Sequence, residues 1–281
     1  EFNIVNPNYN NSDKLVKFGL RASESDRLES FGYKSKKIGG LLGTKFEYLE
    51  DFKIGIETSS FIEDMETVST ASNRQKKQEG NYFDTYIGLD FDYDKRNQKY
   101  QTSDGFRSFY SVDLPLISDN NTVTNFYNYK IFSELYENNI SSISLSLSSA
   151  NSITGDDVKL SERLYIPQKK LRGFVRGKVG PKDGEDYIGG NYYAVINLSS
   201  TLPQVLPNNQ NIDIGTFLDI GNIWGVDDSS LDESSELRSS IGLGVDWFTP
   251  VGPLSFSFAH PISKGSTDKT ETFRFNLGTT F

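Results

Sequence analysis

The chain has 281 residues, 29 of them basic and 38 acidic, which gives a formal net charge of −9. This excess of carboxylates argues against nucleic-acid binding, because neutralising phosphates requires a cationic face. With no Cys and one His, the composition excludes disulfide scaffolds and thiolate metal sites. No apolar run reaches the roughly 18 residues of a membrane-spanning helix.

Apolar and polar residues alternate with a period of two along the chain, which is typical of β-strands with two different faces. The pattern predicts about 13 strands and no recognisable helical segment. In the last strand, Phe273, Phe275 and Leu277 share one face, whereas Arg274 and Asn276 share the other. In chain order the predicted strands lie near residues 1–6, 14–22, 36–48, 51–61, 82–94, 105–116, 122–136, 141–150, 190–202, 210–223, 236–248, 252–260 and 270–281.

The spacing of these strands favours a membrane barrel over a soluble sandwich or jelly roll. The mean repeat is 281/13, about 22 residues, whereas sandwich strands recur every 8 to 12 residues or so. Tight turns near 49–50 and 249–252 alternate with long polar connections at 62–81, 151–189 and 224–235. Short periplasmic turns and long external loops are typical of outer-membrane barrels. Aromatic residues near strand ends agree with an interfacial girdle; they are Phe46, Tyr48, Phe83, Tyr93, Trp247, Phe273 and Phe281.

Five motifs in matching order resemble the BamA family, the central barrel subunit of the outer-membrane protein assembly machinery. They are LRGFVRGKVGP (Leu171–Pro181), GGNYY (Gly189–Tyr193), FLDIGNIWG (Phe217–Gly225), TPVGPLSFSFAHPI (Thr249–Ile262) and FRFNLGTTF (Phe273–Phe281).

The resemblance implies an all-β fold, an antiparallel transmembrane β-barrel with a long inward-folded loop, integral to the bacterial outer membrane. The family's barrel has 16 strands, and about 13 of them are present here. We therefore expect residues 1–281 to form the C-terminal part of the barrel, without the N-terminal strands and the periplasmic repeat domains. The start at Glu1, without an initiator Met or a leader segment, agrees with a fragment or a mature piece.

The longest connection contains the motif Leu171, Arg172, Gly173 and Phe174, and a loop of this length in a compact fold is usually functional. In the family this loop folds back into the barrel lumen. Arg172 offers a rigid fork of donors, Gly173 permits a positive φ, and Phe174 can wedge against aromatic side chains. The resemblance implies Asp219 as the acceptor, since it stands at the family's matching position and on the inward-facing parity of its strand, and a carboxylate can bind a guanidinium in a bidentate, charge-assisted pair.

The surroundings of this pair depart from the family pattern. Ser199 is predicted to stand on the preceding strand where the family usually has a Glu. The network is therefore expected to be weaker, or to run through Asp246 or Asp213 instead. The alternative is a passive plug that only fills the lumen.

The last strand carries a second set of candidate residues. Phe273, Phe275, Leu277 and the terminal Phe281 resemble the signal by which outer-membrane barrels are handed to the assembly machinery. In the family, a kink at the position of Gly278 loosens closure between the first and last strands and makes a lateral gate, where client strands enter by edge pairing. The alternative is an ordinary strand end at the membrane interface.

We find no recognisable catalytic or metal-binding motif, and predict neither enzymatic activity nor a cofactor. A lone His260 lacks an identifiable serine partner for an esterase. An acidic cluster in an external loop offers hard ligands for Ca²⁺, but its spacing matches no known loop, so a solvated acidic loop is the favoured interpretation. Its members are Asp227, Asp228, Asp232, Glu233 and Glu236.

The leading hypothesis is folding and insertion of client β-barrel proteins into the outer membrane, by strand templating and local distortion of the lipid bilayer. The resemblance implies client barrels and accessory lipoproteins as partners. The alternatives are a polypeptide-translocating pore of the same superfamily and a passive porin. A porin predicts stable ion conductance, whereas a loop-plugged insertase predicts small and erratic conductance.

Overall fold

The structure is a computed structural model that describes residues 1–27, 31–99, 102–202, 205, 211–227, 229–231, 236–249 and 252–277. Thirteen strands form one sheet in the order β1-β2-β3-β4-β5-β6-β7-β8-β11-β12-β13-β14-β15. Every neighbouring pair is antiparallel. The predicted fold class and the number of strands are therefore confirmed.

The strands follow one another along the sheet in chain order, and among the described strands the small hairpin of β9 and β10 alone lies outside it. Their bounds are β1 Phe2–Asn6, β2 Leu15–Arg27, β3 Tyr33–Leu49, β4 Phe52–Thr67, β5 Gly80–Asp94, β6 Gly105–Ser118, β7 Thr122–Tyr136, β8 Asn139–Ser152, β9 Lys182–Asp183, β10 Asp186–Tyr187, β11 Tyr192–Thr201, β12 Ile212–Trp224, β13 Arg238–Thr249, β14 Gly252–Ser263 and β15 Phe273–Leu277.

Three short helical turns were not predicted: the 3₁₀ turns Tyr9–Asn11 and Ser229–Leu231 and the α2 turn Asn73–Lys76. Ser72 caps α2, since its hydroxyl accepts from the backbone N–H of Gln75 and the Gln75 side chain accepts from the Ser72 N–H. One turn is too short to show helical periodicity in the sequence. Among the described residues, no helix is long and apolar enough to cross a membrane.

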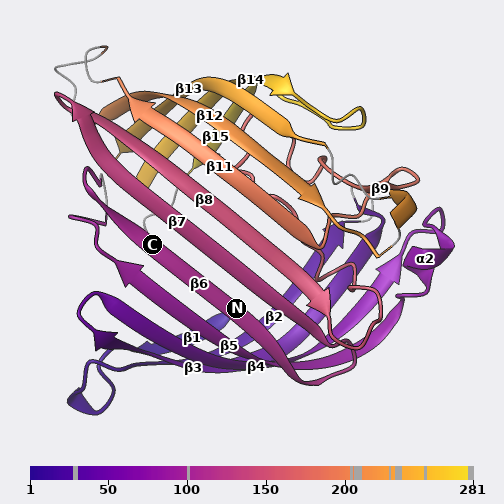
Figure 1. The fold of residues 1–281 in the computed structure, drawn as a ribbon. Coiled ribbons are helices and arrows are strands. Elements are labelled where there is room, and N and C mark those ends of the chain that lie inside the picture. The colour runs from indigo at the N-terminus through magenta and orange to yellow at the C-terminus, as the bar shows by residue number, and fades with distance from the viewer. Residues whose placement is uncertain are drawn as a thin grey trace.

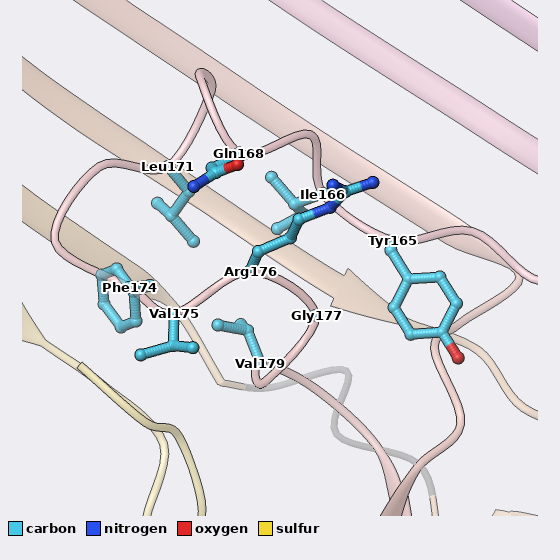
Figure 2. A pocket seen from close by; sticks show the side chains of 9 residues that line it. All are labelled: Tyr165, Ile166, Gln168, Leu171, Phe174, Val175, Arg176, Gly177 and Val179. Atoms are coloured by element: carbon cyan, nitrogen blue, oxygen red, sulfur yellow. The ribbon is translucent and has the colours of Figure 1, made fainter. Parts of the chain in front are cut away.

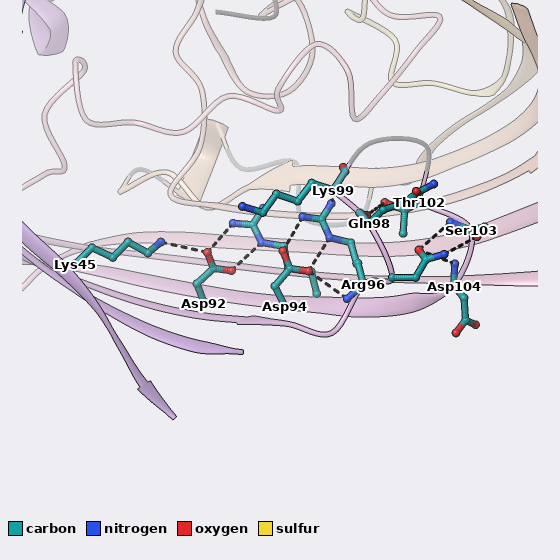
Figure 3. A network of polar contacts seen from close by, with 11 residues as sticks. Lys45, Asp92, Asp94, Arg96, Gln98, Lys99, Thr102, Ser103 and Asp104 are labelled. Atoms are coloured by element: carbon teal, nitrogen blue, oxygen red, sulfur yellow. Dashed lines mark hydrogen bonds and ion pairs between the residues drawn. The ribbon is translucent and has the colours of Figure 1, made fainter. Parts of the chain in front are cut away.

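The two faces of the sheet differ as the alternation predicts. Apolar side chains on the outer face are exposed, among them Ile38, Leu42, Ile62, Ile241, Leu243, Phe273 and Leu277. The inner face carries charges that pair with one another. Figure 3 shows one such network, in which Asp92 accepts from Arg107 Nε at 2.7 Å and from Lys45 Nζ at 3.1 Å. Next to it, Arg96 Nε donates to Asp94 at 2.7 Å. An outer apolar face with a polar interior is the arrangement of a membrane barrel.

The connection of residues 153–191, between β8 and β11, lies on the concave side of the curled sheet (Figure 1). Its apolar residues supply much of the buried core by packing on inward-facing strand residues. One cluster joins loop residues to β11 and β12, and contains Ile166, Leu171, Phe174, Val179, Tyr193, Val195 and Ile223. A second joins the loop to β3 and β4, and contains Tyr33, Met65, Leu160 and Ile188. The predicted inward-folded loop is therefore present.

Candidate functional site in the inward-folded loop

Arg172 and Asp219 form the bidentate pair that the sequence predicts. Arg172 Nη2 donates to Asp219 Oδ1 at 2.6 Å, and Nε donates to Oδ2 at 2.7 Å. The backbone N–H of Arg172 donates to the same Oδ2 at 3.0 Å. The guanidinium lies 3.5 Å from the centre of the Phe217 ring, two residues earlier on the same strand. Asp219 is fully buried, so the loop supplies the charge that its carboxylate requires there.

The strands on either side of β12 complete this arrangement. In the register of β11 and β12, Asn197 is the residue opposite Asp219, and its amide donates to Asp219 Oδ1 at 2.8 Å and to the Lys170 carbonyl at 2.6 Å. On the other side, Ser240 of β13 faces Asp219, and its hydroxyl donates to the Arg172 carbonyl. Asp219 and the loop backbone are thus held from three adjacent strands.

The neighbours of Asp219 differ from the sequence expectation. Ser199 lies two residues beyond Asn197 on β11 and shares a hydrogen bond with Ser142 at 2.8 Å. Asp213 and Asp246 face each other across β12 and β13. They lie near the start of β12, whereas Trp224 lies at its end. The hydrogen-bonded neighbour of Asp219 on the preceding strand is therefore the neutral Asn197, and the Arg172 guanidinium binds Asp219 rather than Asp213 or Asp246.

Gly173 and Phe174 turn the loop away from Asp219 and bury it. Gly173 has φ +85°, and a Cβ there would lie 3.0 Å from Ala259 Cβ and 3.3 Å from Ser240 Cβ. A side chain would therefore be disfavoured both by the backbone conformation and by the close packing. Phe174 and Leu171 are buried, and Figure 2 shows them around a small pocket with Ile166 and Val179.

A second buried ionic anchor, which the sequence analysis missed, joins the loop to the opposite part of the sheet. Lys159 Nζ lies 2.7 Å from Asp84 Oδ2 on β5 and 2.9 Å from Glu63 Oε2 on β4. It also lies 3.4 Å from Glu162 Oε1 and 4.6 Å from the centre of the Tyr82 ring. Burial by itself lowers the pKa of Lys159, but the three carboxylates outweigh burial and raise it above the ordinary lysine value.

The acidic external loop also takes part in holding the inward-folded loop. Asp227 Oδ2 accepts from Arg163 Nη2 and from the backbone N–H of Val158, both at 3.1 Å, and its Oδ1 accepts from Asn191. Asp228, Asp232 and Glu233 lie outside the described residues. Within the described part of the chain, no group of three or more His, Cys, Asp or Glu side chains is arranged to hold a metal ion.

The last strand presents its predicted apolar face to the outside. Phe273, Phe275 and Leu277 are each about half exposed, and β15 pairs with β14 along its five residues. Gly278 and Phe281, the predicted kink and terminal aromatic residue, lie outside the described residues. His260 is exposed on β14.

The comparisons with known proteins agree with this fold. The Omp85 superfamily domain matches residues 1–281. Outer membrane protein assembly factor BamA of Neorickettsia risticii (strain Illinois) is 30% identical over 132 residues, which cover 46% of this chain and 18% of the relative. The same factor of Neisseria meningitidis serogroup B is 32% identical over 143 residues, 40% of this chain and 17% of the relative. The alignments thus span less than a fifth of these relatives.

Among solved structures, the chain is similar to BamA from Haemophilus ducreyi lacking POTRA domains 1–3. The TM-score is 0.88 at 22% sequence identity, and the match covers 99% of this chain and 61% of that structure. The strand arrangement described above is therefore that of a known barrel.

Proposed function

This chain belongs to the Omp85 superfamily and is an integral protein of the bacterial outer membrane, and from that premise we propose that it folds and inserts client β-barrel proteins there. The observation that carries the proposal is the docked loop, in which Arg172 is bound by a fully buried Asp219 and cradled by three strands. Client barrels, accessory lipoproteins and the lipid bilayer are its proposed partners. The absence of enzymatic activity in this protein stays a prediction.

The last strand supports a templating mechanism. β15 pairs with β14 along the described residues Phe273–Leu277, and its apolar side chains point outward; we place the edge that accepts a client strand on its other side. A strand with an unpaired edge offers backbone N–H and C=O groups to an incoming strand, and pairing satisfies groups that hydrocarbon cannot. Client strands would add at this edge, and the free energy would come from hydrogen bonding and from burial of apolar surface. Gly278 as a kink remains part of this proposal.

The loop argues against a permanently open pore. It contacts β4 and β5 through Lys159 and β12 through Arg172, so it crosses the concave side of the sheet. Planar-bilayer recordings of the purified protein should give small, erratic currents. A large steady conductance would instead favour the porin, and export of a partner polypeptide would favour the translocating pore.

The role of the loop is tested with Arg172→Ala in cells whose only copy is the variant. We expect outer-membrane levels of other β-barrel proteins to fall severalfold, because the buried carboxylate of Asp219 loses its cation and the loop undocks. Arg107→Ala is the matched control, since it removes another inner-face ion pair, which joins β6 to Asp92 of β5. Normal client levels with Arg172→Ala would contradict the proposal.

A further inference from the structure

The last strand is attached to the inward-folded loop as well as to the sheet. Arg274, near the start of β15, points to the inner face and is buried. Its Nη2 donates to the Phe174 carbonyl at 2.8 Å, and its Nη1 donates to the Gln168 carbonyl at 3.1 Å. Glu271 pairs with the same guanidinium. Two of the groups that hold Arg274 therefore belong to the loop.

A short backbone ladder reinforces this contact. The segment between β14 and β15 runs antiparallel to the loop, with Phe174 and Thr270 as bridge partners. The N–H of Glu271 donates to the Gly173 carbonyl at 3.0 Å, and the N–H of Val175 donates to the Lys269 carbonyl at 2.9 Å. The loop thus forms sheet-like hydrogen bonds directly before β15 begins.

The same segment is fixed to the barrel wall by a buried ion pair. Arg238 Nε of β13 donates to Asp268 Oδ2 at 2.8 Å, and both side chains are buried. Asp268 Oδ1 accepts in turn from the backbone N–H of Gly180 in the loop, at 3.3 Å. The connection to β15 therefore joins the loop and the wall in one hydrogen-bonded unit.

Both sheet pairing and the loop hold β15. Within the described residues, its register with β14 runs from Phe258↔Phe273 to Leu254↔Leu277, and the N–H of Ala259 donates to the Thr272 carbonyl at 2.8 Å. The hydrogen bonds of Arg274 and the bridge between Phe174 and Thr270 add the loop to this pairing, so loop docking and the position of β15 are linked.

We propose that Arg274 is a positioning residue that couples the docked loop to the last strand, so that the binding of Arg172 by Asp219 also fixes the edge of β15. The relay is short: Arg172 is bound to β12, and Phe174, two residues later, gives its carbonyl to Arg274 on β15. The coupling itself does not depend on the proposed function. Its biological role does rest on that function, because the coupling would set when the edge of β15 is offered to a client strand.

The energetic reason for the coupling is the burial of the arginine. If the loop leaves, the Arg274 guanidinium loses two carbonyl acceptors and keeps Glu271. An unsatisfied buried cation is unfavourable. Once the loop has moved, displacement of β15 therefore lowers the free energy, because it lets the guanidinium find new partners. By reciprocity, displacing β15 weakens loop docking to the same extent.

The test is amide hydrogen exchange of β15 in the full-length protein, purified and reconstituted in lipid. We expect Arg274→Gln to speed exchange at Phe273–Leu277 about tenfold. We expect Arg172→Ala, on a side chain bound three strands away, to speed exchange in the same segment by a comparable factor. Because both act on one coupled unit, the double variant should exchange no faster than about the faster single variant.

Two further variants serve as a substitute and as a control. Arg172→Lys keeps the charge but loses the bidentate fork, and it replaces Arg172→Ala if that variant fails to fold. Arg107→Gln removes an inner-face ion pair with Asp92 on strands away from the loop and should leave β15 exchange unchanged. If loop amides exchange faster in an Arg172 variant while β15 is unaffected, or if the effects of the two changes simply add, the coupling does not exist.

The coupling and the proposed function can fail independently of each other. To distinguish them, client assembly is measured on the same variants as hydrogen exchange. Coupled exchange with normal client assembly would overturn the proposed function and leave the coupling intact, whereas reduced assembly with independent exchange would overturn the coupling alone.

Discussion

At the residue scale, the Arg172 and Asp219 pair was predictable and its neighbours were not. The resemblance of the loop motif to the family, together with the matching position and inward parity of Asp219, indicates the two charged side chains. Alternation assigns a residue to a face but not to a register, and Asn197 and Ser199 share a face. A shift of two residues in the pairing of β11 with β12 therefore decides which of them meets Asp219, and the structure selects Asn197.

Gly173 gives the sharpest prediction at this scale. Gly173→Ala should undock the loop and lower the temperature at which the barrel unfolds, because φ is +85° and the new Cβ would lie 3.0 Å from Ala259 Cβ. Gly155→Ala is the matched control, since Gly155 also has φ +85° but a Cβ added there would meet no atom within 4 Å. The measurement is heat-modifiability on semi-native gels. Equal losses in the two variants would show that close packing at Gly173 does not matter.

At the scale of elements, the period-two pattern located the thirteen strands but ended several of them too early, β2 and β4 by the largest margins. β2 continues to Arg27 and β4 to Thr67, beyond the predicted 22 and 61. In β4 the extension carries Glu63 and Met65 inward against the loop, and beyond Ile62 the alternate residues are the charged Asp64 and Glu66, so the apolar pattern fades while pairing continues. Lys159 was missed for a related reason, because its partners on β4 and β5 are remote in sequence.

Lys159→Met should loosen the first part of the loop without removing the Arg172 anchor. It leaves Glu63, Asp84 and Glu162 close together without their shared cation, and breaking such a buried group typically costs about 3–5 kcal/mol. We expect faster proteolysis within 153–170. Lys182→Met, in the same loop with an exposed partner, is the control. Unchanged proteolysis in Lys159→Met would mean that the anchor contributes nothing.

The pH dependence of this anchor follows from its raised pKa. Folding raises the pKa of Lys159, so its contribution to stability is fully present below the ordinary value of 10.5 and is lost as pH rises through the higher folded value. Proteolysis of 153–170 in the native protein should therefore be the same at about pH 7 and about pH 10, after correction for protease activity. Release of the segment between these two values would contradict the assigned charge state.

At the scale of the whole molecule, the outer face is exposed and apolar while the inner face is charged and filled by the loop. Ile56 points outward on β4, and Ser59, three residues later, points to the inner face. Ile56→Lys should destabilise the membrane-inserted protein, by at most about 2–4 kcal/mol, because a cation on the lipid-facing side is unfavourable. Ser59→Lys should have a smaller effect. Unfolding in urea from lipid vesicles measures both, and the reverse order would contradict the assigned faces.

The central claim is that assembly activity depends on the loop being docked by Asp219. The most direct measurement is the rate at which the purified protein, reconstituted in liposomes, folds a client β-barrel, compared between the wild type and Asp219→Asn. This variant keeps the shape of the acceptor and removes the charge that binds Arg172. A rate reduced about tenfold, with faster exchange of loop amides, is the predicted result. An unchanged folding rate in a variant whose loop has demonstrably undocked would contradict the claim.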